Sequence, residues 1–360
     1  MRVKCALFVE VTEEADLAAL DWNALPQPVM VMGGGSNLLF TKDFPGTVLH
    51  VAICHSERSE ESWTLGAGVV FDDFCAWAAS EGLWGPENLS LIPGECGASA
   101  VQNIGAYGVE AKDIICGIRA YDRETGTFVH IDPADCGYGY RTSKFKTEWK
   151  GRYIITAVTY RLLKTPQPKL DYGGIRKALE DRGKAVPSEI AFASLRPLPS
   201  ASPTGPSLLS GRGWPEISEG TAFPLSPQDI RDAIIDIRRK KLPAVEEVGS
   251  AGSFFCNPVI SREHFARIEA TAREDNGPEY SVPHFEVGDQ IKVPAAWMID
   301  QCGFKGARNG GAQVFHNQPL VIVNASGTAS PADIIGLENQ VIRAVEAKYG
   351  ITLRPEVEHV

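Results

Sequence analysis

The chain has 360 residues, of which 44% are hydrophobic and 22% charged, so it exceeds a typical single domain and has enough apolar material for more than one core. Its formal net charge of −10 argues against a nucleic-acid-binding surface, because phosphate contacts need clustered cations. The first apolar stretch is too short for a signal peptide, and no later one reaches transmembrane length. We therefore expect a cytoplasmic protein without a membrane partner.

The cysteines and histidines do not indicate a metal centre. The eight cysteines lie far apart without a Cys-x-x-Cys pair, and no two of the seven histidines have metal-ligand spacing on a helix. In a cytoplasmic chain we expect reduced thiols, no disulfide framework and no metal site.

The first half mixes short strands and helices irregularly. We expect a strand over 29–32, a helix over 71–81 that Gly82 ends, paired strands over 118–121 and 128–131, and a long β-branched and aromatic strand over 153–163. This order indicates an α+β fold and not the regular βαβ alternation of a dinucleotide-binding fold.

A change in composition follows. Residues 187–224 contain seven prolines and seven serines with almost no periodicity, which predicts a flexible insertion. Ser226 and Pro227 then open a helix in the pattern of an N-cap followed by proline. The run Arg238-Arg239-Lys240-Lys241 at its end is more typical of a solvated helix terminus that compensates the helix dipole than of a ligand site. A last helix begins at Ser330-Pro331 and ends before Gly350.

Two glycine-rich segments could hold a ligand. Gly33-Gly34-Gly35-Ser36-Asn37 follows a strand, and its amides could form a nest for a phosphate or simply a tight turn. The longer segment 92–108 reads IPGECGASAVQNIGAYG, and its four glycines would let a flat ligand lie against the backbone. Turn formation alone explains this second segment poorly, so we favour ligand binding there.

Two further stretches carry polar side chains beside aromatic ones. Tyr140 and Arg141 could grip a carboxylate or could belong to a solvated charge run at a strand entry. The stretch 250–258, SAGSFFCNP, could be a turn that buries two phenylalanines or a support for the hydroxyl of Ser253. Neither stretch decides between its alternatives when read alone.

Taken together and in order, these segments resemble the UDP-N-acetylenolpyruvoylglucosamine reductase family of flavoenzymes (MurB), over nearly the whole chain. Eight motifs carry the resemblance: GGGSNLL at 33–39, IPG at 92–94, QNIGAYG at 102–108, YRxSxFK at 140–146, KLP at 241–243, AGSFFxNP at 251–258, WMIDQC at 297–302 and PEV at 355–357.

The resemblance implies a vanillyl-alcohol-oxidase-type (PCMH-type) FAD domain over 1–165, built from two subdomains over about 1–60 and 61–165. Residues 166–240 would hold a mobile tyrosine loop, the insertion and a linking helix. Residues 241–346 would form a smaller substrate-binding domain, and 347–360 a tail returning to the active site. We expect a monomer.

The family chemistry is the NADPH-dependent reduction of UDP-N-acetylglucosamine enolpyruvate to UDP-N-acetylmuramate, with non-covalent FAD as the hydride carrier, in peptidoglycan precursor synthesis. The resemblance implies that Arg141 and Glu356 hold and polarise the substrate carboxylate and that Ser253 supplies a proton. It implies FAD contacts from Gly33, Gly34, Gly35, Ser36, Asn37, Ile92, Pro93, Gly94, Gly97, Gln102, Asn103, Ile104, Gly105 and Tyr107. It implies UDP-sugar contacts from Tyr140, Tyr172, Lys241, Asn257 and Gln301.

The chain departs from the family pattern at three positions. Ala100 stands where proline is common, Cys256 where lysine is common, and Glu358 where arginine is common. The last of these reverses a charge two residues from Glu356.

Two other functions remain as alternatives. A flavin-linked sugar or alcohol oxidase would share the fold, and a covalently held flavin would favour it. A non-catalytic nucleotide-sugar sensor would have no reason to keep Arg141, Ser253 and Glu356 together.

Overall fold

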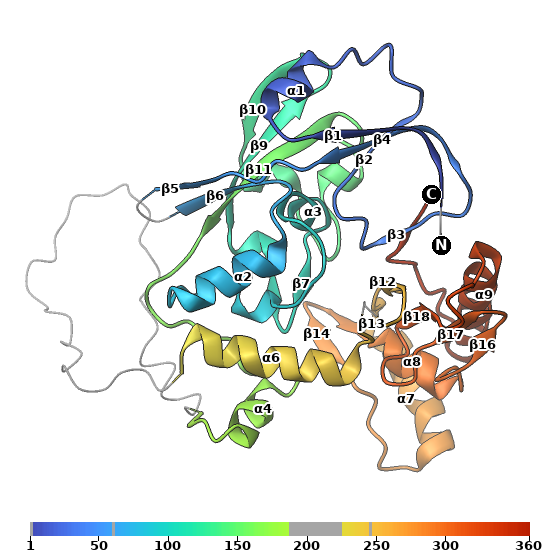
Figure 1. Ribbon diagram of the computed structural model, residues 1–360. Helices are drawn as coiled ribbons and strands as arrows, with labels where there is room; N and C mark the ends of the chain where they lie inside the picture. Colours follow the sequence, from blue (N-terminus) through green and yellow to red (C-terminus); the bar gives the residue numbers. More distant parts are fainter. Residues whose placement is uncertain (1–2, 60–61, 187–224, 245–246) are drawn as a thin grey trace, which may run out of the picture.

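The computed structural model describes residues 3–59, 62–186, 225–244 and 247–360, and Figure 1 shows their arrangement. The chain begins with a small parallel sheet of order β1-β4-β2. Its elements are β1 (Cys5–Val11), α1 (Glu14–Ala19), β2 (Val29–Met32) and β4 (Phe44–Val51). The strand predicted over 29–32 is therefore confirmed, and the glycine-rich segment follows its end.

A five-stranded antiparallel sheet of order β10-β9-β11-β6-β5 follows. Its strands are β5 (Ser56–Arg58), β6 (Ser62–Gly66), β9 (Ile115–Asp122), β10 (Thr127–Ile131) and β11 (Tyr153–Arg161). The pairing of β9 with β10 confirms the predicted hairpin. Helix α2 (Phe71–Ser80) ends before Gly82, whose φ of 71° suits glycine, so the predicted helix is confirmed within a residue.

Short elements lie between the strands of this sheet in the sequence. They are η1 (Glu87–Leu89), α3 (Cys96–Gln102), β7 (Gly105–Ala106), β8 (Val109–Glu110), η2 (Ala111–Asp113), η3 (Pro133–Cys136) and η4 (Lys144–Lys146). Of these, α3 and β7 contain the predicted flavin-contact residues Gly97, Gln102 and Gly105. Both sheets and α2 contribute to one hydrophobic core, which contains Leu49, Phe71, Ile118 and Tyr160. The predicted α+β fold of the first part is thus confirmed.

Helix α6 (Pro227–Lys241) runs beneath α2 toward the C-terminal part, and α4 (Ile175–Asp181) packs on the side of α6 that faces away from α2 (Figure 1). They share a small core of their own with Trp84 and Leu170. Ser226 caps α6 as predicted, because its hydroxyl accepts the amide of Asp229. The predicted flexible insertion over 187–224 lies outside the described residues.

The C-terminal part contains two small antiparallel sheets, of order β12-β18-β17-β16 and β13-β15-β14, packed with three helices. The elements are β12 (Ser250–Ser253), β13 (Val259–Ser261), α7 (Arg262–Asn276), β14 (Phe285–Val287), β15 (Gln290–Lys292), α8 (Ala295–Gln301), β16 (Arg308–Asn309), β17 (Ala312–Val314), β18 (Val321–Asn324) and α9 (Pro331–Tyr349). Within the described ranges, no helix combines the length and the apolar character that a membrane span needs.

The tail after α9 returns to the first part of the chain (Figure 1). Its strand β19 (Glu358–His359) pairs in parallel with β3 (Leu38–Leu39), directly after the glycine-rich segment. Gly350, with a φ of 66°, ends α9, as predicted for the last helix. Tyr349, the last residue of α9, is buried in the C-terminal core.

Candidate active site

The loop after β2 offers free backbone donors. The amides of residues 34 to 37 donate to no acceptor among the described residues, and Gly35 adopts a left-handed φ of 68°. The hydroxyl of Ser36 donates to the carbonyl of Pro93 at 3.3 Å, which ties this loop to the second glycine-rich segment. Consecutive free amides around a left-handed glycine form an anion nest, so this geometry suits a phosphate.

The predicted flavin-contact residues of the second segment serve several purposes. Gly94 has a φ of 117°, which a side chain rarely adopts. A Cβ at Gly97 would lie 2.8 Å from that of Ala67, so Gly97 lets α3 pack against its neighbour. A Cβ at Gly105 would lie 3.1 Å from Arg141 Nη1, so Gly105 leaves room for that guanidinium. Ile92, Gln102, Ile104 and Tyr107 are half-buried nearby, whereas Pro93 is exposed.

Asn103 holds the loops around the site together. It is fully buried with a left-handed φ of 46°, and its side-chain amide donates to Glu110 at 3.0 Å and to the carbonyl of Gly139 at 2.8 Å. Its side-chain oxygen accepts the amide of Lys112 at 3.0 Å. These bonds occupy both ends of the side-chain amide, so its clearest role is to position the loop that carries Tyr140 and Arg141.

Arg141 and Glu356 come together although 215 positions separate them. Arg141 Nε lies 3.0 Å from Glu356 Oε1, and Arg141 Nη2 donates to the carbonyl of Gly105 at 2.6 Å. Arg141 has a φ of 56°, a strained conformation for a residue with a side chain, and such strain is concentrated at functional sites. Its guanidinium also lies 5.5 Å from the centre of the Tyr140 ring.

Backbone contacts bring Ser253 to the same place. The amide of Glu356 donates to the carbonyl of Phe254 at 2.8 Å, and Phe255 forms a bridge with Pro355. Phe254 and Phe255 are buried and fix this segment in the C-terminal core. The Ser253 hydroxyl is half-buried and has no hydrogen-bond partner among the described residues, so it is free to meet a ligand.

The site carries an excess of positive charge. Burial raises the pKa of Glu356, while Arg141 and Lys146 oppose that shift. Burial lowers the pKa of Lys292 and of Arg238, and the charge of Arg141 lowers both further. Glu110 opposes the shift of Lys292, and Asp72 opposes that of Arg238. Cations that repel one another in this way favour an anionic ligand.

Aromatic residues form one wall of the site. The ring of Tyr172 stacks on that of Phe285 at 5.1 Å and meets the edge of Tyr107 at 6.4 Å. Lys292 lies between the Phe285 ring, at 5.5 Å, and the Tyr140 ring, at 5.2 Å. The predicted residues Tyr140 and Tyr172 are therefore connected through residues of the C-terminal part.

The other predicted substrate-contact residues, Asn257, Lys241 and Gln301, lie in different surroundings. The side-chain oxygen of Asn257 accepts the amide of Ala295 at 2.9 Å, which leaves its NH₂ group available. Lys241 is exposed at the end of α6. Gln301 contacts Asn276 at 3.3 Å and Lys348 at 3.0 Å, and no contact in the described part joins it to Arg141 or Glu356.

Sequence reasoning missed Phe285 and Lys292 and misread Arg238. Arg238 is half-buried, and its Nη2 donates to the carbonyl of Leu91 at 3.2 Å, so the predicted solvated run is exposed only over its last three residues. Lys292 follows the buried Ile291 in a strand, so alternation places it on the opposite face, and the pattern gave no signal that it would reach the site. Phe285 lies in a strand whose residues are all exposed, so the sequence offered no signal for it.

Glu358, the departure from the family pattern, is neutralised by a partner in the first part of the chain. Lys150 Nζ lies 2.5 Å from its carboxylate. The reversed charge therefore forms a cross-domain ion pair and leaves Glu356 undisturbed.

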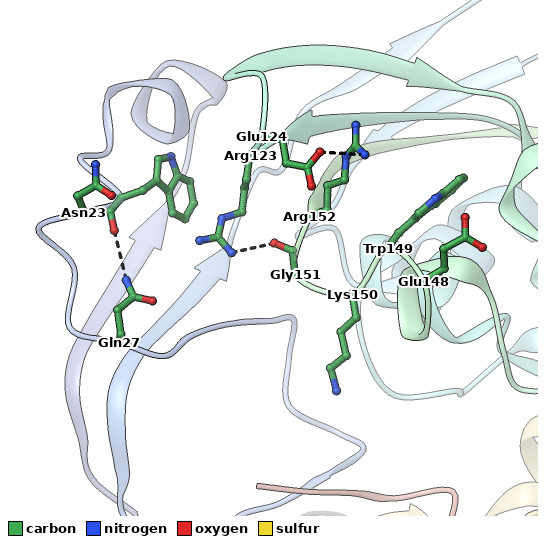
Figure 2. A pocket seen from close by; sticks show the side chains of 10 residues that line it. Asn23, Gln27, Arg123, Glu124, Glu148, Trp149, Lys150, Gly151 and Arg152 are labelled. Atoms are coloured by element: carbon green, nitrogen blue, oxygen red, sulfur yellow. Dashed lines mark hydrogen bonds and ion pairs between the residues drawn. The ribbon is translucent and has the colours of Figure 1, made fainter.

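A cavity of about 760 Å³ lies between the loop before β2 and the turn before β11 (Figure 2). Its lining does not include Arg141, Ser253 or Glu356. Its arginines are already engaged. Arg123 lies 4.5 Å over the Trp22 ring and donates to the carbonyl of Gly151, and Arg152 pairs with Asp122 and Glu124. Lys150, the other cation of this lining, pairs with Glu358, so each cation of the cavity already has a partner.

The residues present fit an FAD diphosphate at the loop of residues 33–37, because the amides are free and the glycines leave the backbone accessible. One residue has the wrong charge for this ligand. The carboxylate of Glu95 lies directly against Gly33 and Gly34.

Comparisons with known proteins agree with this geometry. A model of the FAD-binding domain matches residues 5–132, and a model of the C-terminal domain of UDP-N-acetylenolpyruvoylglucosamine reductase matches residues 243–360. The chain is therefore an FAD-binding oxidoreductase with the two-subdomain α+β fold expected from its sequence.

Full-length relatives define the family. The UDP-N-acetylenolpyruvoylglucosamine reductase of Bacteroides fragilis is 40% identical, covering 99% of this chain and 95% of the relative. That of Burkholderia ambifaria is 38% identical, covering 96% and 89%. The crystal structure of the enzyme from Thermus caldophilus has the same fold, with a TM-score of 0.59, 21% identity and coverage of 98% of this chain and 91% of that one. The chain belongs to the UDP-N-acetylenolpyruvoylglucosamine reductase family.

Proposed function

We propose that this protein reduces UDP-N-acetylglucosamine enolpyruvate to UDP-N-acetylmuramate with NADPH, in peptidoglycan precursor synthesis. The observation that carries the proposal is the ion pair of Arg141 and Glu356, 3.0 Å apart. The backbone of Glu356 is bonded to Phe254, next to Ser253, whose hydroxyl has no partner in the described part of the chain. The proposal includes action as a monomer in the cytoplasm.

The FAD would lie on the nest of residues 34–37 and on the second glycine-rich segment, held without a covalent bond. When bound, it supplies the hydride transfer from NADPH to the β-carbon of the enol ether. The remaining steps belong to the side chains of this chain.

Arg141 would bind the carboxylate of the enolpyruvyl group. Negative charge develops on that carboxylate as hydride adds to the conjugated double bond, so preformed positive charge lowers the barrier. Lys292 and Arg238 add to the positive field, and Glu356 fixes the orientation of the guanidinium.

Ser253 would complete the reaction by giving its hydroxyl proton to the α-carbon. The O–H bond breaks as the C–H bond forms, the charge on the substrate carboxylate is relieved, and the resulting Ser253 alkoxide regains a proton from water. A serine hydroxyl is a weak acid, but a carbanion-like carbon in a water-poor site is basic enough to take its proton. Tyr172 and Phe285, stacked at the wall, would exclude water from this step.

The test is an absorbance experiment on the purified protein. NADPH added without oxygen should bleach the bound flavin, and the UDP-sugar should then restore its colour. Bleaching of the oxidised flavin by a simple sugar or an alcohol, without NADPH, would favour the oxidase alternative. Tight UDP-sugar binding without recolouring would favour a sensor.

A further inference from the structure

The negatively charged carboxylate of Glu95 lies against the loop that is proposed to bind a diphosphate, where a carboxylate is unexpected. A Cβ added to Gly33 would lie 2.9 Å from Glu95 Oε2, and one added to Gly34 would lie 3.4 Å from Glu95 Oε1. Glu95 Oε2 is buried and has no hydrogen-bond partner among the described residues. The loop beside it has free amides from residue 34 to residue 37.

Glu95 belongs to a small charged cluster with His50 and Glu10. His50 Nε2 lies 3.0 Å from Glu95 Oε1, and His50 Nδ1 lies 3.2 Å from Glu10 Oε2. A neutral imidazole has only one N–H, so serving both carboxylates requires the imidazolium. Burial lowers the pKa of His50, but its hydrogen bonds to Glu95 and Glu10 outweigh burial and leave the pKa above its ordinary value.

Other groups around the cluster do not neutralise it. The Cys54 thiol faces Glu95, and its pKa is raised by burial and by that carboxylate. The ring of Phe8 from β1 lies 6.4 Å from that of His50 and carries no charge. One imidazolium with two carboxylates leaves a net charge of −1 next to the loop.

A diphosphate bound to the same loop would lie close to the buried carboxylate of Glu95, and the two negative charges would repel each other. The repulsion disappears if the unpartnered oxygen of Glu95 is protonated, because a carboxylic acid then donates a hydrogen bond where a carboxylate could only repel. We propose that Glu95 takes up one proton from solvent as FAD binds, and that its Oε2–H then donates to a phosphate oxygen. This inference rests on the FAD position given under the proposed function.

The test is calorimetric titration of the FAD-free protein with FAD at pH 8, in two buffers of different ionisation enthalpy. The expected result is uptake of close to one proton per FAD, with affinity that weakens by up to about tenfold per pH unit above neutrality. Glu95→Gln should abolish the uptake and make the affinity independent of pH. Glu10→Gln is the matched control, because it touches the same histidine without touching the loop, and it should keep the uptake.

Further outcomes separate the alternatives. Uptake that survives in Glu95→Gln but disappears in His50→Gln would assign the proton to His50 and overturn the proposal. Binding without uptake by the parent protein would overturn it while leaving the proposed function intact, whereas no FAD binding at any pH would overturn both. An infrared difference spectrum gives an independent readout, since FAD should create a protonated-carboxyl band in the parent that Glu95→Gln lacks.

Discussion

The side-chain amide of Asn37 donates a hydrogen bond to the backbone carbonyl of Glu356 at 3.0 Å. The bond joins the loop proposed to hold the cofactor to the backbone of Glu356, the residue whose carboxylate pairs with Arg141. The amide of Glu358 returns a bond to the carbonyl of Asn37 at 3.1 Å, so the two segments are held on both sides. Asn37 thereby couples the two halves of the site, in addition to the predicted contact with the flavin.

Asn37→Ala should slow substrate-driven reoxidation of the flavin more than its reduction by NADPH. The lost hydrogen bond stabilises the position of Glu356 by about 1 kcal/mol, which corresponds to about fivefold in rate. Stopped-flow absorbance would follow both half-reactions, with Ser36→Ala as the control in the same loop. Equal slowing of both halves would show that Asn37 acts on the cofactor instead.

Ser253→Ala should leave the bleaching of the flavin by NADPH unchanged and slow its recolouring by substrate at least a hundredfold, since a positioned proton donor contributes about 10²–10⁴-fold. Ser250→Ala is the matched control, because Ser250 lies on the same strand and its hydroxyl accepts only a long bond from Gly252, at 3.5 Å. Normal recolouring in Ser253→Ala would remove this residue from the mechanism.

Phe285→Leu should raise the KM for the UDP-sugar several-fold while leaving flavin reduction by NADPH unaffected. The substitution removes the ring that stacks on Tyr172 at 5.1 Å and contacts Lys292, but it keeps an apolar side chain on β14. Val287→Leu, on the same exposed strand, serves as the control. A KM equal to that of the parent would mean that the aromatic wall does not touch the substrate.

Glu87→Gln should stabilise the protein increasingly as the pH rises from 5 to 8. Glu87 is buried, and its burial raises the pKa to about 7 in the folded state, against its hydrogen bond from the Gly85 amide. Because the folded pKa exceeds the unfolded value of about 4.3, the stability that Glu87 contributes is present at low pH and is lost as the pH rises through about 7. Glutamine keeps the acceptor for Gly85 and has no proton to lose.

Urea unfolding of parent and variant at several pH values measures this difference, which should grow by no more than about 1.4 kcal/mol per pH unit. Glu81→Gln, at an exposed helix end, should show no such trend. A constant difference across the range would contradict ionisation of Glu87 in the folded protein.

The helices and strands that could be predicted from the sequence are those determined by residues close together in the chain. The strand at 29–32, the hairpin around Arg123 and the helices opened by Ser226 and Ser330 follow from periodicity, turn residues and caps within a few positions. The pairing of Arg141 with Glu356 followed from the family resemblance, because no local rule joins residues so far apart. The FAD-contact and substrate-contact assignments of the other residues stay predictions.

What sequence reasoning missed depends on contacts between distant segments. The flavin contact predicted for Asn103 stays a prediction, but its bonds from the amide to Glu110 and Gly139 and from the oxygen to Lys112 were not foreseen. Arg238 belonged by sequence to a solvated run, but the packing of α6 turns it toward Leu91. No pattern of neighbouring residues reveals which partner the fold will bring to such side chains.

The return of the tail to β3 means that the parts of the active site are completed in a fixed order as the chain is synthesised. A ribosome makes the glycine-rich loop and Arg141 first, Ser253 later, and Glu356 later still. A nascent or interrupted chain that stops short of residue 356 can contain the whole nest for the cofactor but lacks the carboxylate that orients Arg141. The carboxylate needs synthesis to pass residue 356, and its position is fixed only when β19 (Glu358–His359) is complete and can pair with β3.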